Sequence, residues 1–297
     1  MKIKANGIDI EVEDTGAGKG GKRPVVLLIM GLGMQLVAWP PALVRALVEA
    51  GYRVIRHDNR DIGLSQHFDH MGVPNMVWAS LKFKLGLPVS APYSLKDMAA
   101  DSTGVLDALG INKAHVVGVS MGGMIAQRVA LAAPGRVASL TSIMSSSGAR
   151  GLPQATPKVM RAMLSRPASS SRDDIVAHYV KLYKAIGSPG FPIPEAEMAD
   201  RILKGITRNF HPQGTLRQMA AIVADSGRAH ELARIKKPTL VLHGEADPLV
   251  PYRCGQDTAR RIEGARLVGI EGMGHDLAPG VVDRLLALLF PFLRAHA

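Results

Sequence analysis

The sequence predicts an α/β protein with a mostly parallel central sheet, helices on both faces of that sheet, and an inserted helical cap. Strand-like and helix-like segments alternate along most of the 297 residues, which is typical of a parallel sheet with crossover helices. The alternation stops between about residues 145 and 227, where four helical patterns follow one another. One serine among glycines also joins a strand directly to a helix. We therefore expect a core of residues 1–144 and 228–297 and a cap of residues 145–227.

The first part of the chain predicts an antiparallel hairpin followed by buried strands. Asn6-Gly7 separates the alternating segments "KIKA" and "IDIEVE", which is the signature of a two-residue hairpin turn. Residues 24–30, "PVVLLIM", form a continuous apolar run, as expected of a strand buried on both faces. A helical pattern over 42–50 and the strand "YRVIRHD" come next.

The middle and end of the chain predict further alternating elements around one long irregular stretch. That stretch covers residues 59–93, which are rich in Gly, Pro and aromatic residues. Ser94 then begins a helix as its N-cap, with an acidic residue three positions later and Gly110 just past its end. The remaining predicted elements are, in order, a strand and helix within 115–131, the strand "RVASLTSIM", the strand "PTLVLHG", the helix "YRCGQDTARRI", the strand "ARLVGIEG" and a helix over 281–295.

Composition narrows the class of protein. The formal net charge is +11, but the basic residues are scattered and no nucleic-acid-binding motif accompanies them, which favours a solvated basic surface over a specific nucleic-acid site. The single cysteine, Cys254, excludes an internal disulfide and is expected to be a small packing residue. The N-terminal segment lacks a signal-peptide pattern, and the longest apolar runs are too short to span a bilayer. We expect a cytoplasmic monomer or homodimer without a membrane span.

Ser120 is the candidate nucleophile. It lies in Gly118-Val119-Ser120-Met121-Gly122, where a buried strand runs straight into a helix. G-x-S-x-G in this context is the nucleophile elbow, in which a serine occupies a sharp, strained turn and small neighbours prevent collisions. The alternative interpretation is a glycine-rich turn that only lets the helix and strand pack closely.

A serine needs a base, and the base needs an orienting acid. On this kind of fold the acid and then the histidine follow the serine along the chain, at the carboxyl ends of strands. Asp247 follows "PTLVLHG" and His275 follows the last predicted strand, so they are the candidate acid and base. Asp225, Glu245 and Asp276 are the competing carboxylates, and His275 could instead be an ordinary loop histidine.

Stabilisation of an oxyanion requires two preorganised backbone N–H groups. Met121, directly after the nucleophile, is the expected first donor. The loop Met30-Gly31-Leu32-Gly33-Met34 follows the first buried strand, and its Leu32 amide is the expected second donor.

With these motifs in place, the chain resembles the α/β-hydrolase superfamily over essentially its whole length, and capped esterases of the aclacinomycin methylesterase type in particular. The motifs that carry the resemblance are "LLIMGLGMQLVAW", "VIRHDNRDIGLS", "HVVGVSMGG", "HGEADPLVP" and "GMGHDLAP". Two features depart from the pattern: Met30 replaces the histidine common before the oxyanion glycine, and residues 66–93 are longer than in many relatives.

The resemblance implies an α/β-hydrolase fold and a carboxylesterase that acts on a small-molecule ester through an acyl-enzyme, without a cofactor. A serine nucleophile argues against haloalkane dehalogenase and epoxide hydrolase chemistry. Hydrolysis of C–C bonds, thioester hydrolysis and perhydrolysis stay open because they use the same triad. A ligand receptor with little turnover is the alternative from another class.

Several side chains are expected around the site. Methionines at helical spacing in the cap include Met160 and Met198, and the irregular stretch carries Trp78. Helical spacing favours core packing for most of the cap methionines, but together with Trp78 they could line an apolar substrate cleft. Arg60 and Asp61 are expected to brace a turn. The histidines show no metal-ligand spacing, that of His67 and His70 included, and no metal site is expected.

Overall fold

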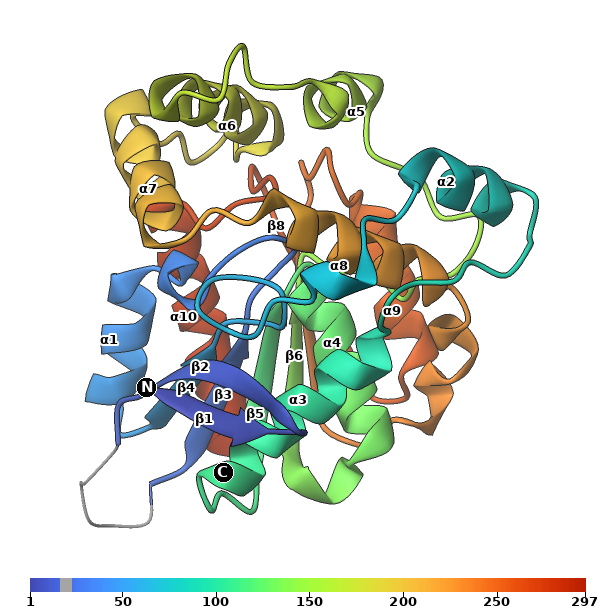
Figure 1. Cartoon of the computed structure of the whole chain (residues 1–297). Helices are drawn as coiled ribbons and strands as arrows, with labels where there is room; N and C mark the ends of the chain where they lie inside the picture. The colour runs from blue at the N-terminus through green and yellow to red at the C-terminus, as the bar shows by residue number, and fades with distance from the viewer. Residues whose placement is uncertain (17–22) are drawn as a thin grey trace.

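The computed structural model describes residues 1–16 and 23–297. Its strands are β1 (Lys2–Ala5), β2 (Ile8–Asp14), β3 (Val25–Ile29), β4 (Arg53–His57), β5 (Ala114–Val119), β6 (Val137–Ile143), β7 (Thr239–Gly244) and β8 (Arg266–Ile270). Its α-helices are α1 (Pro41–Glu49), α2 (Met76–Lys84), α3 (Leu95–Ala108), α4 (Met121–Ala132), α5 (Pro157–Leu164), α6 (Arg172–Ile186), α7 (Glu195–Arg208), α8 (Pro212–Ala224), α9 (Tyr252–Arg261) and α10 (Pro279–Ala295). Figure 1 labels these elements along the chain.

The strands form one eight-stranded sheet in the order β1-β2-β4-β3-β5-β6-β7-β8. All pairings from β4 to β8 are parallel, whereas β1 and β2 join antiparallel at one edge. The strand order reverses at β3, which lies between β4 and β5. The loops after β3 and β5 therefore diverge at a topological switch point, where open α/β sheets form their ligand sites.

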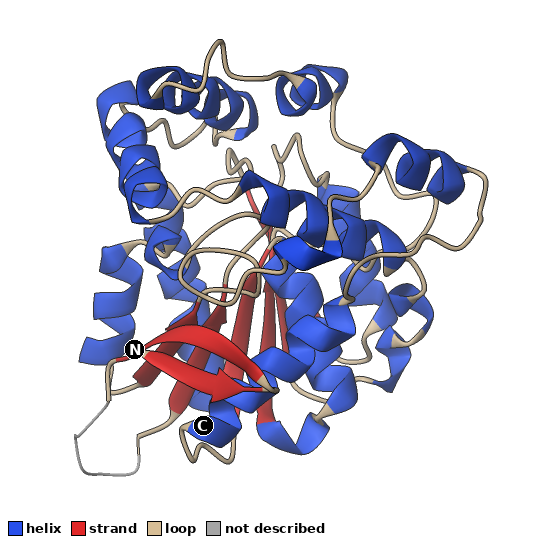
Figure 2. Ribbon diagram, in the orientation of Figure 1, coloured by secondary structure: helices blue, strands red, loops and turns tan. Residues whose placement is uncertain are grey.

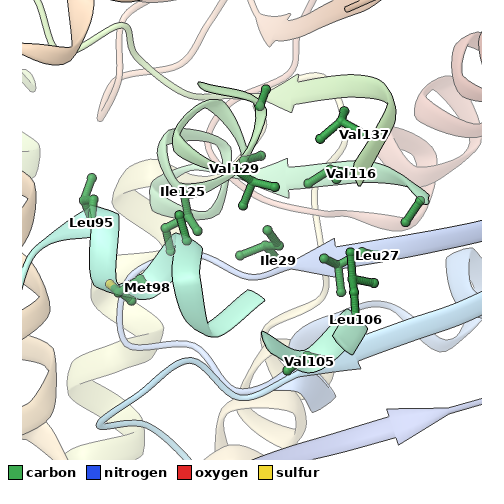
Figure 3. Packing of buried hydrophobic residues seen from close by; sticks show 14 of the residues in the cluster. Leu27, Ile29, Leu95, Met98, Val105, Leu106, Val116, Ile125, Val129 and Val137 are labelled. Carbon is green, nitrogen blue, oxygen red and sulfur yellow. The ribbon is translucent and has the colours of Figure 1, made fainter. Parts of the chain in front are cut away.

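The sheet is covered on both faces, as its apolar strands predict. In β3, Leu27 and Ile29 belong to one core cluster, whereas Val26 and Leu28 belong to the other. This alternation follows from the two-residue period of a strand. Helices α3 and α4 cover the first face (Figure 3), and α1 and α10 cover the second, so the helices form the two outer layers seen in Figure 2.

Local sequence signals set several boundaries as predicted. Asn6 and Gly7 both have positive φ, and they join β1 to β2 through the pairing of Ala5 with Ile8. Ser94 and Asp97 form a reciprocal capping box at the start of α3. The expected hairpin and the expected helix start are therefore confirmed.

The prediction that residues 59–93 are irregular is wrong in one part, because this stretch contains α2. Asn75 caps this helix by accepting a hydrogen bond from the Trp78 amide at 3.0 Å. Only Ala79 of the helix is buried, and its apolar residues are spread around the axis instead of forming one stripe. The sequence therefore lacked the periodicity that identifies a surface helix.

Helices α5 to α8 lie between β6 and β7, at the end of the sheet where the parallel strands finish (Figure 1). Helix α8 is tied to the turn after β4 by Arg217, which pairs with Asp61 at 2.8 Å and 2.9 Å while both side chains are fully buried. Burial acts to raise the pKa of Asp61, but the hydrogen bonds from Arg217 and the Phe68 amide hold it below its ordinary value. No helix within the described residues is both long and apolar enough to cross a membrane.

Candidate active site

Ser120 occupies the turn between β5 and α4 with φ 54° and ψ −121°. A positive φ is strained for a residue with a side chain, and such strain is found at functional turns. The glycines make the turn possible: a Cβ at Gly118 would collide with the Gly122 carbonyl, and a Cβ at Gly122 would collide with that of Ile29. The spacing of glycines in this motif is therefore a steric requirement of bringing β3, β5 and α4 together beneath the serine.

Ser120, His275 and Asp247 form one hydrogen-bonded chain, although they come from three separate loops. His275 Nε2 lies 3.0 Å from Ser120 Oγ, and His275 Nδ1 lies 2.7 Å from Asp247 Oδ2. With the Nδ1 proton donated to a carboxylate, the lone pair at Nε2 faces the serine hydroxyl. The arrangement can remove the proton of Ser120 and stabilise the imidazolium that results.

The loop that carries Asp247 is held in a single arrangement. The Leu249 and Val250 amides donate to Asp247 Oδ1 at 2.9 Å and 2.8 Å, which leaves Oδ2 to the histidine. His243 Nε2 donates to the Val250 carbonyl at 2.7 Å, and burial lowers the pKa of His243. A neutral His243 therefore stabilises the loop that carries Asp247.

Two of the three competing carboxylates are engaged elsewhere, and the third, Glu245, has no hydrogen bond to His275. Asp225 pairs with Arg128 and Arg228 in a buried network. Asp276 hydrogen-bonds to Ser188. Of the carboxylates that the sequence left open, the structure brings Asp247 to the histidine.

The loop that carries the base is attached to the chain at the end of α6. The His275 amide donates to the Ile186 carbonyl at 2.7 Å, and the Gly274 amide donates to Ser188 Oγ at 2.8 Å. Sequence reasoning missed Ser188, because neither its neighbours nor its spacing indicates contact with a residue almost ninety positions away. A small polar residue just after a helix was the one weak signal.

The loop after β3 lies against the serine, as expected. A Cβ at Gly31 would be 3.2 Å from Ser120 Cβ, so the backbone of this loop passes directly beside the candidate nucleophile. The Gly33 amide donates to Gln218 Oε1 of α8 at 2.9 Å, and Gly33 has φ +68°. Within the described chain, the Leu32 and Met121 amides have no protein acceptor. Both expected oxyanion donors are thus available to a ligand.

The expected substrate contacts lie in different surroundings. Met198 is buried in α7, whereas Met160 of α5 is exposed. Trp78 lies on α2 and lines a surface pocket of about 300 Å³ whose walls do not include Ser120 or His275. The structure does not bring Trp78 to the hydrogen-bonded chain.

Other expected residues behave as structural elements. Arg60 pairs with Asp101 at 2.6 Å and 2.7 Å, and Asp61 pairs with Arg217, so both brace the turn after β4 as predicted. Cys254 is buried and free.

The fold brings together one group of side chains of the kinds that bind metals, which their spacing in the sequence did not indicate. Atoms of His67, Asp69 and His211 lie within 4.8 Å of one another. The two imidazole rings stack at 3.9 Å, and Arg217 donates to Asp69 at 2.8 Å. A guanidinium on the shared carboxylate oxygen competes with a cation there, so this group reads as a brace between α8 and the turn before α2.

Known proteins are similar to most or all of the chain. A family profile for the alpha/beta hydrolase fold matches residues 24–278. The chain is 30% identical to rhodomycin D methylesterase of Streptomyces peucetius, with 97% of this chain and 96% of that protein covered. It is 27% identical to 2-hydroxy-6-oxononadienedioate/2-hydroxy-6-oxononatrienedioate hydrolase of Burkholderia vietnamiensis, with 99% and 94% covered. Among solved structures, a meta-cleavage product hydrolase from Pseudomonas fluorescens is similar with a TM-score of 0.76 at 21% identity, covering 100% of this chain and 98% of that one.

Proposed function

The chain belongs to the alpha/beta hydrolase family, and we propose that it hydrolyses carboxylic esters with Ser120 as its nucleophile. The observation that carries the proposal is the continuous hydrogen-bonded chain from Asp247 through His275 to Ser120 Oγ. The similarity to a methylesterase over nearly the full length of both proteins favours an ester over other acyl compounds.

In the proposed mechanism, His275 Nε2 takes the proton of Ser120 as its oxygen attacks the acyl carbon. Asp247 keeps the imidazole in the correct tautomer and stabilises its cation. The Leu32 and Met121 amides bind the oxyanion of the tetrahedral intermediate. The alcohol then departs with the proton from His275, and water repeats the same steps on the acyl-enzyme. Every group in this sequence belongs to the protein, the substrate or water, so the proposal includes no cofactor or metal.

Hydrolysis of a C–C bond is the second candidate. The observation in its favour is the similarity to a dienedioate hydrolase over 99% of this chain. The same serine, histidine and aspartate would serve both reactions. Parallel assays with an aryl ester and a vinylogous diketone acid separate the two activities, and we expect the larger kcat/KM for the ester.

We propose residues 145–227 as a cap over the site, with Met198 on the acyl side of the cleft; Met160 is exposed on α5 and is not part of this proposal. Trp78 lines a separate surface pocket whose walls exclude Ser120 and His275, so it is not part of this proposed cleft. Each methylene that enters the cleft should gain up to ~0.8 kcal/mol until the cleft is filled. Esters with short to medium apolar acyl groups are therefore the expected substrates, and charged acyl groups the poor ones. The expected setting is a cytoplasmic monomer or homodimer.

The test is a burst assay with an activated aryl ester on the parent and on Ser120→Ala. Loss of the nucleophile should cost on the order of 10⁶ in kcat and should abolish the burst of alcohol. Ser80→Ala is the matched control, since Ser80 is exposed on α2. If Ser120→Ala retains more than a tenth of the activity, Ser120 is not the nucleophile.

A further inference from the structure

An exposed apolar surface surrounds α2. The exposed fractions of Val77, Trp78 and Leu85 are 82%, 55% and 63%. The other exposed apolar residues of this segment are Met71, Val73, Leu81 and Leu87. We call the exposed residues of 71–87 the α2 surface. Soluble proteins seldom leave apolar side chains clustered in this way unless they contact a partner.

Helix α5 adds to this surface. Met160 and Leu164 are exposed and four residues apart, so they share the outer face of α5, whereas Val159 is buried. Arg150, in the chain that leads to α5, donates to the Gly86 carbonyl at the end of α2 at 3.1 Å. Both helices are seen in the upper right of Figure 1.

The same two segments are rich in cations and free of acids. The sequence contains no Asp or Glu between Asp69 and Asp97, nor between Asp107 and Asp173. The basic residues within or next to α2 and α5 are Lys82, Lys84, Arg150, Lys158, Arg161 and Arg166. Within the described residues none of them is in an ion pair. Lys82 lies 5.7 Å from the ring centre of Trp78.

We propose that the α2 surface and the exposed face of α5 bind a lipid surface that carries negative charge. Apolar side chains enter the headgroup boundary, an exposed tryptophan prefers that interface, and unpaired lysines and arginines attract anionic headgroups. Lysine and arginine stems can also lie along apolar surface while their charges stay in water. Exposed apolar side chains, a tryptophan and unpaired cations therefore occur together on α2 and on α5, which belongs to the proposed cap.

The charges and the apolar side chains argue against two other binding partners for this surface. A second copy would pair this surface with itself, because most dimers are symmetric, and the cations of both copies would then face one another. A nucleic acid would match the cations, and Trp78 could stack on one base, but the aliphatic side chains of Val77, Leu85 and Leu164 offer it neither stacking nor hydrogen bonding. Of these three occupants, the lipid surface is the one that satisfies both the charges and the aliphatic side chains.

The experiment is co-sedimentation of the full chain with vesicles of phosphatidylcholine alone or mixed with phosphatidylglycerol, at low and high salt. Binding is expected only with phosphatidylglycerol, and it should weaken as salt rises. Lys82→Ser with Lys84→Ser should lower the partition coefficient roughly tenfold. Arg45→Ser with Lys113→Ser removes the same charge from exposed positions on α1 and just before β5, and should leave binding unchanged.

A second variant, Val77→Ser with Leu85→Ser and Leu164→Ser, tests the apolar part and should weaken binding at constant charge. Ser120→Ala should bind as the parent does, so failure of the proposed esterase and failure of this proposal are distinguishable. No binding of the parent to phosphatidylglycerol vesicles overturns the proposal. An equal loss of vesicle binding in the Arg45 and Lys113 control would also overturn it. So would a dimer in solution that dissociates when Val77, Leu85 and Leu164 are replaced.

Discussion

The hydroxyl of Ser188 donates to Oδ1 of Asp276 at 2.5 Å, directly after the candidate base in the chain. Ser188 Oγ in turn accepts a hydrogen bond from the amide of Gly274, the residue directly before that base, at 2.8 Å. A single buried serine therefore holds the residues on both sides of His275. Because Ser188 follows α6, the segment between β6 and β7 helps to position the imidazole.

Ser188→Ala should lower kcat about tenfold to a hundredfold with little change in KM, because a small displacement of a catalytic group has a large effect on rate. It should also lower the free energy of unfolding by about 1–3 kcal/mol, since buried partners lose their hydrogen bonds. Steady-state kinetics and denaturant unfolding measure the two effects.

Ser147→Ala is the matched control for Ser188→Ala. Ser147 is also buried and donates to a carboxylate, Asp257, at 2.5 Å. We expect a similar loss of stability with kcat unchanged. Equal losses of kcat in the two variants would mean that Ser188 acts only through stability.

Asp247→Asn should reduce kcat by roughly 10⁴, because the amide favours the wrong tautomer of the histidine. Asp225→Asn should weaken the fold through Arg128 and Arg228 but leave the kcat of the folded protein near that of the parent. Kinetics on both purified variants compare them. A larger loss of kcat in Asp225→Asn would contradict the choice of Asp247.

Gln218→Leu should lower kcat by about tenfold or more and leave KM nearly unchanged. Gln218 accepts the Gly33 amide and donates to the Arg60 carbonyl, both at 2.9 Å, so it fixes the peptide that follows Leu32. Oxyanion donors act only in the transition state, which is why kcat carries the effect. Gln127→Leu, another fully buried glutamine, is the control. If both variants lose kcat equally, the proposed link to the oxyanion loop is wrong.

Acid should destabilise the fold between about pH 6.5 and pH 4. Burial lowers the pKa of His57 to about 4, below the value of about 6.5 expected in the unfolded chain. The unfolded state therefore binds more protons in this range, so the stabilisation is present above pH 6.5 and is lost as the pH falls toward 4. Near pH 4.5 the loss from His57 alone is on the order of 2 kcal/mol.

The measurement for this pH effect is denaturant unfolding from pH 7 to pH 4.5. Burial also lowers the pKa of His115 to about 4, so the parent should show the sum of two such groups. His57→Gln should flatten the dependence, whereas His70→Gln, at an exposed position, should not. An unchanged slope in His57→Gln would count against His57 as a source.

The sequence predicted the sheet and the serine turn well because both depend on local chemistry. The glycines around Ser120 are a steric signature, and the two-residue turn at Asn6 and Gly7 sets the hairpin by itself. Helix α2 was missed because its apolar residues are not confined to one face. Ser188 and Gln218 were missed for another reason: their partners lie far away in the sequence, so only the folded chain brings them together.

The buried pair of Arg217 with Asp61 limits how freely the segment between β6 and β7 can be exchanged among relatives. Replacing residues 145–227 as a cassette would leave a fully buried carboxylate without its guanidinium, which is strongly destabilising. The same exchange would remove Gln218, which accepts the Gly33 amide, and Ser188, which holds the residues on both sides of His275. A transplant that ends before α8 keeps the pair and the glutamine. In modular terms, α8 travels with the sheet, as do Arg208 of α7, which pairs with the buried Asp58, and Ser188 after α6, so only the helices before Ser188 form an exchangeable part.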